Sequence, residues 1–390
     1  MRLVRGAGLP STDIALSRET RVLVGAVRWF VGAATEDDLV GLLGGGGLDW
    51  SRLFEQAERE GITGIVARAL DSLSPREGLA LPLDRWRAAT RAVAVSNMTS
   101  LSELAALRAM LRRGHRPMIL LKGAALLDDE YRGHLGLRPL GDIDLLLRPS
   151  DLPAVTGWLR DRGYKPVSSS SPFFSRGVVS FDLHTEIVGS EWVGLKGRAF
   201  RLDPAALWRE AIRLEPHDPT TLVLSRVHLR LHLAVHALKH SYSRLIWLVD
   251  LALVLRDAPW ASLLGEARAA GAMRPLAYAV SALDTLLGRL EMPDAVRGEL
   301  PALSALERAF IRLVASRRGM ETPGELLVAF SIPGAIGKAA YLAELVFPKR
   351  PVLARHYPMT PSWLLYPRRV LRLVSLSLQE GTKLWHRRGG

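Results

Sequence analysis

The spacing of hydrophobic residues changes twice along the chain. From about residue 36 to 115, apolar residues recur every three or four positions between Gly and Pro breaks, which predicts several helices. From 116 to 203, short apolar runs with the two-residue period of strands alternate with brief helical segments. Helical spacing then returns. The pattern predicts an α+β protein, with a small mixed-sheet core flanked by N-terminal and C-terminal helical regions.

These changes suggest four segments. Residues 1–115 form an N-terminal helical region, 116–203 the α/β core, 204–347 a helical domain and 348–390 a basic C-terminal segment. We see no fixed-period repeat.

Two aspartates open the apolar run GDIDLLLR, residues 141–148. Successive side chains of a strand point to opposite faces, so Asp142 and Asp144 point the same way. Two carboxylates this close repel each other unless a cation lies between them. Mg²⁺ is the natural cation, because it binds one or two carboxylates together with substrate phosphates. The alternative is a strand whose solvent face simply begins with two acids.

A third carboxylate lies in the alternating segment VVSFDLHTEIV, residues 178–188. The alternation puts Asp182, His184 and Glu186 on one face. If this strand lies beside the first, Asp182 joins Asp142 and Asp144 around a metal pair, as two-metal phosphoryl chemistry requires. Stacked acids would destabilise the sheet without a cation. Asp182 is also a candidate base for activating an acceptor hydroxyl.

The segment LLKGAALL, residues 120–127, predicts a strand that ends at Lys122 and Gly123 and a helix that follows. The free N–H groups and the positive end of that helix can receive a phosphate, and Lys122 adds an ammonium donor. The spacing is not that of a P-loop. The alternative is a strand-to-helix turn that simply needs a glycine.

Four segments in sequence order resemble the uncharacterised nucleotidyltransferase family of bacteria, within the polymerase-beta-like nucleotidyltransferase superfamily. They are LKGAALLDDEY, LRPLGDIDLLL, FDLHTEI and HALKHSYSRLIWLVDLALVL, and the resemblance covers roughly residues 95 to 260. It implies an α/β nucleotidyltransferase core that binds a nucleoside triphosphate, such as ATP, with Mg²⁺. The implied reaction transfers a nucleotidyl group to an acceptor.

On this resemblance, Asp142 and Asp144 match the metal-binding pair, Asp182 the third carboxylate and Gly123 the glycine of the nucleotide-binding turn. The sequence departs from the superfamily pattern twice. Ala124 stands where a second Gly or a Ser is usual, so a hydroxyl contact to phosphate is lost. The 18 residues between Gly123 and Asp142 also exceed the usual gap.

Further groups are expected to face the nucleotide or the acceptor. Arg138 lies in the long gap, and His184 shares a face with the third carboxylate. The resemblance favours His236 and Lys239 as well, together with Asp250. Because Asp250 lies in the apolar helix WLVDLALVL, it needs a partner, which Lys239 or Arg244 could supply.

Four histidines recur at four-residue intervals, which puts His228, His232, His236 and His240 on one helix face. A zinc site would need further ligands or an H-E-x-x-H pattern, and neither is evident in the sequence. The pattern favours a polar seam against the catalytic core over a metal site, with packing in the core or in solvent as the remaining interpretation.

Composition narrows the class of protein. The chain has 390 residues, 48% of them hydrophobic and 23% charged, and is long enough for two or three globular domains. With no Cys there is no disulfide and no thiolate site, which fits a cytoplasmic protein. Arg28 and Asp250 interrupt the longest apolar runs, so we expect no transmembrane segment and no secretory signal. The net charge of +13 favours anionic partners.

The basic tail from residue 348 holds nine Lys or Arg and one acid, Glu380. It could lie on an acidic membrane surface or bind a nucleic acid. A solvated helix that covers the core is favoured, with Leu365, Val370, Leu373 and Val374 facing inward.

Three functional classes remain. The leading one is a Mg²⁺-dependent nucleotidyltransferase that acts on a small molecule, peptide or protein. The second is a related transferase of sugar or phosphoryl groups in a biosynthetic cluster, and the third is a catalytically degenerate nucleotide-binding protein. The sequence does not identify the acceptor.

Overall fold

The strands form one seven-stranded sheet, with the strand order β3-β4-β5-β2-β1-β7-β6. The computed structural model describes residues 16–44, 46–74, 81–167, 172–187, 200, 202–316, 322–357 and 359–385. The strands are β1 (Met118–Leu120), β2 (Ile143–Leu147), β3 (Lys165–Pro166), β4 (Phe173–Arg176), β5 (Val179–His184), β6 (Ile212–Arg213) and β7 (Thr221–Val223).

The middle of the sheet is buried on both faces. β1 runs antiparallel to β2 and parallel to β7, and β2 runs parallel to β5. Every residue of β1 and β2 is buried, which explains why these strands appear in the sequence as apolar runs. β5 alternates buried and half-buried residues, as its two-residue pattern predicts. The mixed sheet within a largely helical chain confirms the predicted α+β class.

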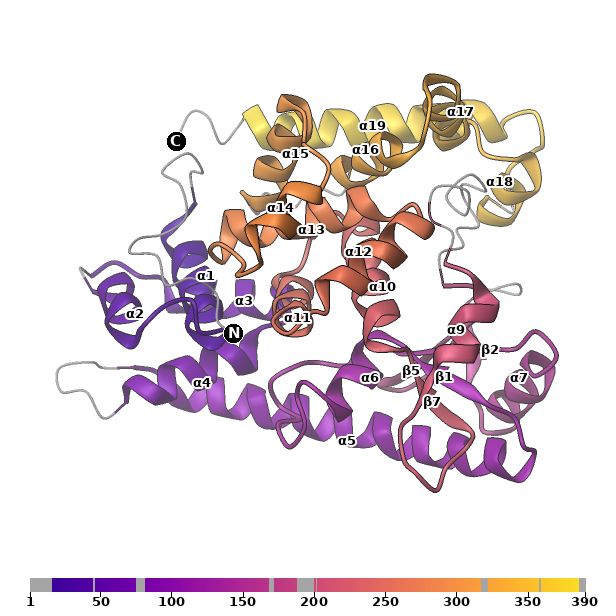
Figure 1. Cartoon of the computed structure of the whole chain (residues 1–390), viewed down its shortest axis with the longest axis horizontal. Coiled ribbons are helices and arrows are strands. Elements are labelled where there is room, and N and C mark those ends of the chain that lie inside the picture. Colours follow the sequence, from indigo (N-terminus) through magenta and orange to yellow (C-terminus); the bar gives the residue numbers. More distant parts are fainter. Residues whose placement is uncertain are drawn as a thin grey trace.

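The first helices of the chain begin at side-chain caps. The Ser17 side chain accepts a hydrogen bond from the Thr20 N–H, and Thr35 and Asp38 form a reciprocal capping box. The helices are α1 (Arg18–Phe30), α2 (Glu36–Leu43), α3 (Trp50–Glu60), α4 (Thr63–Leu73) and the 31-residue α5 (Leu83–Arg113). In Figure 1, α5 runs along the lower edge of the molecule, beneath the sheet.

The remaining helices lie within the sheet region or on its C-terminal side, which is the upper part of Figure 1. They are α6 (Lys122–Asp128), α7 (Leu152–Asp161), α9 (Pro204–Glu210), α10 (Arg226–Lys239), α11 (Leu245–Leu255), α12 (Trp260–Ala269), α13 (Met273–Leu286), α14 (Asp294–Glu299), α15 (Ala305–Ala315), α16 (Thr322–Ser331), α17 (Ala335–Val346), α18 (Arg350–His356) and α19 (Leu365–Trp385).

One continuous apolar core joins the sheet to the helices on either side. It extends from Val22 in α1 to Tyr341 in α17. A second, small cluster of Leu353, Tyr357 and Leu365 lies apart from it near the C-terminus. The predicted segment boundaries at residues 115, 203 and 347 stay a prediction. In the described part of the chain, no helix is both long and apolar enough to cross a membrane.

The connection from α6 to β2 is fixed by the N-terminal helices. The Asn97 side chain, buried in α5, donates to the carbonyl oxygens of Leu135 (2.7 Å) and Arg138 (2.8 Å) and accepts from the Leu140 N–H (2.9 Å). Gly64 of α4 packs so closely that an added Cβ would lie 2.0 Å from the Gly136 carbonyl oxygen. These contacts therefore fix the backbone conformation of residues 135–140.

Asn97→Ala is expected to destabilise the protein by about 2–3 kcal/mol, because three buried backbone groups lose their hydrogen-bond partner. The measurement is urea unfolding, together with amide hydrogen exchange of residues 135–141, which should become faster. Thr99→Ala, at an exposed position of the same helix, is the matched control and should change neither. Equal exchange in the two variants would contradict a role for Asn97 in fixing this loop.

Candidate active site

The nine residues that the sequence singled out line one cavity of about 430 Å³. It opens beside the ends of β2 and β5 and is closed on the other side by α10 and the start of α11. The nine residues are Lys122, Gly123, Arg138, Asp142, Asp144, Asp182, His184, His236 and Lys239. The structure thus brings together residues from four separate parts of the sequence.

Strand register sets two of the acids side by side. In the parallel pair β2 and β5, Asp144 lies directly opposite Asp182. His184, two residues along β5, places Nε2 3.0 Å from Asp144 Oδ1 and 3.1 Å from Asp182 Oδ2. Potential ligand atoms of these three residues lie within 4.8 Å of one another. They are the one group in the described part of the chain that could share a metal ion.

Asp142 lies in the cavity but outside this three-residue group. It precedes the first residue of β2, whereas the sequence placed it on the strand as an equal partner of Asp144. Glu186, expected on the same face, lies beyond the end of β5 and is exposed. The residue that completes the group with Asp144 and Asp182 is therefore His184, and not Asp142 or Glu186.

Lys122 is held in a strained position against the acids. It begins α6 with a φ of 44°, in the left-handed region, which costs a non-glycine residue about 1–3 kcal/mol. Its Nζ donates to Asp144 Oδ1. Burial alone would raise the pKa of Asp144, but the hydrogen bond from His184 and the charge of Lys122 outweigh it and lower that pKa. Asp144 is therefore ionised.

The pKa values of the two neighbouring aspartates shift in opposite directions. Burial and the charge of Asp144 raise the pKa of Asp142 to about 6, despite the opposing charge of Lys122. For His184, burial lowers the pKa, but hydrogen bonds to Asp144 and Asp182 outweigh it, so the net shift is upward. The cluster therefore holds more negative charge than Lys122 compensates.

Asp250 has a different partner from those expected. Its carboxylate, 1% exposed, accepts from Arg138 Nε (3.0 Å) and Nη2 (2.8 Å) and from the Tyr131 hydroxyl (2.8 Å). The sequence pointed to Lys239 or Arg244, because these lie close along the chain, whereas the observed partners come from the α6–β2 connection. Asp250 thus orients Arg138 at the wall of the cavity.

Gly123 makes room for this arginine. A Cβ at Gly123 would lie 2.3 Å from Arg138 Nη1 and 2.8 Å from Leu140 Cδ1. A larger residue at this position would have to displace the ends of these two side chains, so the glycine also serves packing, in addition to any contact with a phosphate. Sequence reasoning did not foresee this contact, nor the part of Asn97 in holding the loop. An Asn within the region of predicted helices was the available signal.

The histidine stripe divides into two parts. His228 and His232 are buried, and His228 Nε2 lies 3.4 Å from Glu266. His236 and His240 line the cavity that contains the acids and pack against the Trp247 ring, with ring centroids 5.3 and 5.2 Å from its centroid. Only the second half of the stripe therefore lies between α10 and the site. In the described chain the stripe contributes to no group that could hold a metal ion.

His232 is expected to make the protein sensitive to acid. Burial, together with the charge of Lys122, lowers the pKa of His232 to about 3, and its Nε2 has no hydrogen-bond partner among the described residues. The unfolded chain takes up this proton below about pH 6.5 and the folded chain does not, so stability falls as the pH falls. The further charges acting on it belong to Asp144, His184 and Lys239.

The expected contribution of His232 is a loss of about 2 kcal/mol between about pH 8 and about pH 5. Burial also lowers the pKa of His236, which adds to the dependence, whereas the raised pKa of Asp142 opposes it. The free energy of unfolding of His232→Gln should therefore fall by about 2 kcal/mol less than that of the wild type across this range. His217→Gln, at an exposed position, is the control and should follow the wild type. A His232→Gln protein with the pH dependence of the wild type would contradict the prediction.

A second cavity of about 320 Å³ adjoins the first. The two share Pro139, Leu140 and Arg244 in their linings. The second cavity extends between α5 and the corner of α3 and α4, over small residues such as Ala89 and Ala92. The Nη2 atom of Arg244 lies against Gly61 there. The site thus has two neighbouring cavities with a shared wall, one lined mainly by polar groups and one mainly apolar.

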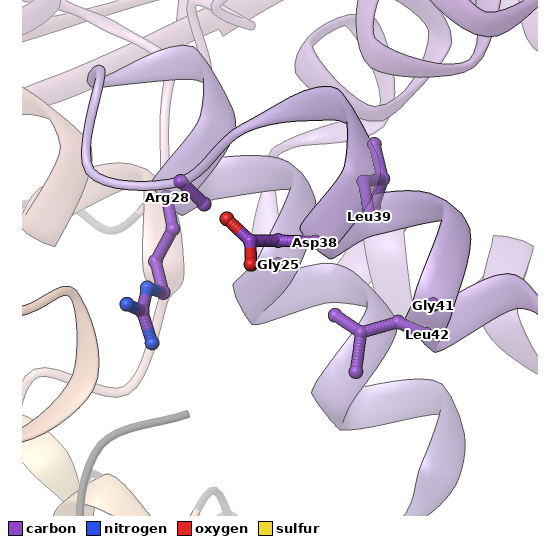
Figure 2. Close-up of a pocket in the computed structure, with 7 residues that line it drawn as sticks. Gly25, Arg28, Asp38, Leu39, Gly41 and Leu42 are labelled. Carbon is purple, nitrogen blue, oxygen red and sulfur yellow. The ribbon is translucent and has the colours of Figure 1, made fainter. Parts of the chain in front are cut away.

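A third cavity, of about 190 Å³, lies between α1 and α2, far from the acids in sequence. Figure 2 shows Leu42 directed toward Gly25, and the Asp38 carboxylate between them and Arg28. That carboxylate accepts hydrogen bonds of 2.8 Å from the Thr35 N–H and hydroxyl. Asp38 is therefore engaged in capping α2, and the cavity lacks the clustered titratable groups of the larger site.

Comparison with known proteins gives one result. The model of a protein family described as uncharacterised nucleotidyltransferase matches residues 46–288. No curated protein and no solved structure matches the chain. The matched range covers more than half of the chain. It contains all nine candidate site residues that line the cavity, from Lys122 to Lys239. The chain belongs to the uncharacterised nucleotidyltransferase family.

Proposed function

We propose that this protein is a Mg²⁺-dependent nucleotidyltransferase that moves a nucleotidyl group from a nucleoside triphosphate to an acceptor. The observation that carries the proposal is the group of Asp144, Asp182 and His184 in a cavity with Lys122 and Asp142. Membership of a nucleotidyltransferase family supports the reaction class. Its donor, metal and acceptor are proposed from the chemistry of the site.

The donor set fits a hard divalent cation. Asp144 and Asp182 offer carboxylate oxygens on paired strands, and burial together with the charge of Asp144 raises the pKa of the neighbouring Asp142. Asp144, Asp182 and His184 would hold the ion, with Asp142 at its edge. When bound, Mg²⁺ would supply charge stabilisation at the transferring phosphoryl group.

The chain's own residues supply the remaining functions. Lys122, and Lys239 on the facing helix, would bind the phosphate oxygens. Asp182 is partly exposed and would accept the proton of the acceptor nucleophile. The acceptor oxygen or nitrogen then attacks the α-phosphorus, its bond to phosphorus forms, and the bond from that phosphorus to pyrophosphate breaks.

The two neighbouring cavities would accommodate two substrates. The larger one is lined by the acids and the cations, which suits the triphosphate. The adjoining one is lined mainly by small apolar residues and opens past Arg244, which suits part of the acceptor or the nucleoside. Their combined size lies within the usual range for ligand sites, on the order of 300–1,000 Å³.

The test uses each of the four nucleoside triphosphates, labelled either at the α- or at the γ-phosphate, with a small-molecule extract as acceptor pool. Nucleotidyl transfer places the α-label in a new product and releases the γ-label as pyrophosphate, only when Mg²⁺ is present. Transfer of the γ-label would instead indicate a phosphotransferase. No transfer and no thermal stabilisation by any triphosphate with Mg²⁺ would overturn the proposal.

A further inference from the structure

The last helices of the chain carry large apolar side chains that the protein does not cover. Met359 is 91% exposed, Trp363 74%, Leu371 70% and Val374 50%. The sequence favoured a helix with four apolar residues facing inward, namely Leu365, Val370, Leu373 and Val374. Of these four, only Leu365 is buried. Val370 and Val374 are exposed, and Leu373 is half-buried. An apolar surface here therefore needs another explanation than packing against the core.

These side chains share one surface with basic residues. Residues three and four positions apart lie on the same side of a helix, so Arg368, Leu371 and Arg372 face the same way, with Val374 beside Leu371. The loop before α19 adjoins them, because the Arg368 guanidinium hydrogen-bonds Thr360 and lies 4.9 Å from the Tyr357 ring centroid. We call Met359, Trp363, Arg368, Leu371, Arg372 and Val374 the C-terminal face.

The charge of the segment that carries the C-terminal face is mainly positive. Between residues 348 and 379 the sequence contains six Lys or Arg and no Asp or Glu. α17, α18 and α19 lie along the upper edge of the molecule in Figure 1, on the side opposite α5. A basic surface with protruding Trp, Leu and Met side chains has the composition of a helix that lies in the headgroup region of a bilayer.

We propose that the C-terminal face binds the surface of a bilayer that contains anionic phospholipid. Arg368 and Arg372 pair with lipid phosphates, and Trp363, Leu371 and Met359 enter the boundary between headgroups and acyl chains. A nucleic acid would use the basic groups but leave Leu371 and Met359 in water. A second copy of this chain would bring like charges together across the interface. The observed combination therefore favours the lipid surface.

The test is co-sedimentation of the full chain with phosphatidylcholine vesicles, with and without about one quarter phosphatidylglycerol. The protein is expected to bind the anionic vesicles and not the neutral ones, with binding that weakens as salt rises. Leu371→Ser should weaken binding roughly tenfold, and Arg372→Gln about fivefold. Met98→Ser, exposed on α5 at the opposite edge, is the matched control and should bind like the wild type.

Three results would overturn the proposal. One is equal or absent binding to the two kinds of vesicle. Another is tight binding of duplex DNA that Leu371→Ser leaves unchanged, without vesicle binding. The third is a concentration-dependent dimer that Leu371→Ser dissociates, again without vesicle binding. Circular dichroism and the melting temperature of each variant show whether it is folded, and both substitutions are at exposed positions, where folding should be unaffected.

Discussion

Asp144→Asn is expected to abolish turnover, with a loss of about a thousandfold or more in the rate of α-label transfer. Asp144 is almost fully buried, lies opposite Asp182 and contacts both Lys122 and His184. Asparagine preserves its shape but removes the charge that would hold a divalent cation. Asp182→Asn should also slow transfer while affecting triphosphate binding less, because Asp182 is proposed to serve the attacking group.

Stability should change in opposite directions at the two neighbouring aspartates. In metal-free protein at about pH 8, Asp142→Asn is expected to raise the free energy of unfolding by about 1–2 kcal/mol, because the charged form of Asp142 is disfavoured in the fold. Asp144→Asn should lower it, because Asp144 has a depressed pKa and two favourable partners. Urea unfolding in the presence of a chelator measures both.

Asp128→Asn is the control for these variants, since Asp128 is partly exposed in α6 and pairs with Arg132 outside the cavity. It should retain wild-type transfer and stability. An Asp144→Asn protein that keeps full activity and full Mg²⁺-dependent stabilisation would show that Asp144 is only a buried partner of Lys122 and His184 and holds no metal ion.

Asp250→Asn is expected to destabilise the protein by about 3–5 kcal/mol, the usual cost of removing one partner from a buried ion pair. Arg138 is 6% exposed and directs two of its nitrogens at Asp250, so it would keep a buried charge without compensation. Burial alone would lower the pKa of Arg138, but the charge of Asp250 outweighs it and raises that pKa. The variant removes this compensating charge, so the burial of the guanidinium is no longer offset.

The matched variant removes the whole polar group, as Tyr131→Phe, Arg138→Met and Asp250→Leu together. Its free energy of unfolding should lie well above that of Asp250→Asn, because no buried charge or hydroxyl remains without a partner. Urea unfolding compares the two proteins. If the triple variant is less stable than Asp250→Asn, the loss in the single variant comes from disrupted packing and the prediction is wrong.

The parts of the site that follow a short local pattern could be predicted from the sequence. The two-residue period of FDLH and the apolar run after GDID predicted two strands that carry Asp182 and Asp144, and the structure pairs these strands so that the two acids lie opposite each other. The family and the α+β class were confirmed as well. These predictions succeed because strand alternation and motif order depend on residues that are close together in the sequence.

The contacts that escaped prediction join residues far apart in the sequence. Arg138 and Asp250 are 112 positions apart, and Asn97 is 43 positions from Leu140. A buried polar group needs a hydrogen-bond or ion-pair partner, but the sequence does not show which residue that partner is. For Asp250 the nearest cations along the chain were therefore considered first, and Tyr131 and Arg138 were not connected with it.

The support of residues 135–140 by α4 and α5 limits how this catalytic core could be transplanted. A cassette of residues 116–203 would carry Asp144 and Asp182 on their strands, yet it would leave behind the Asn97 amide that holds the approach to them. It would also lack Asp250, the counter-ion of Arg138. A graft that preserves the geometry must therefore include Gly64, Asn97 and α11, so this protein is better exchanged as a whole chain than divided into modules.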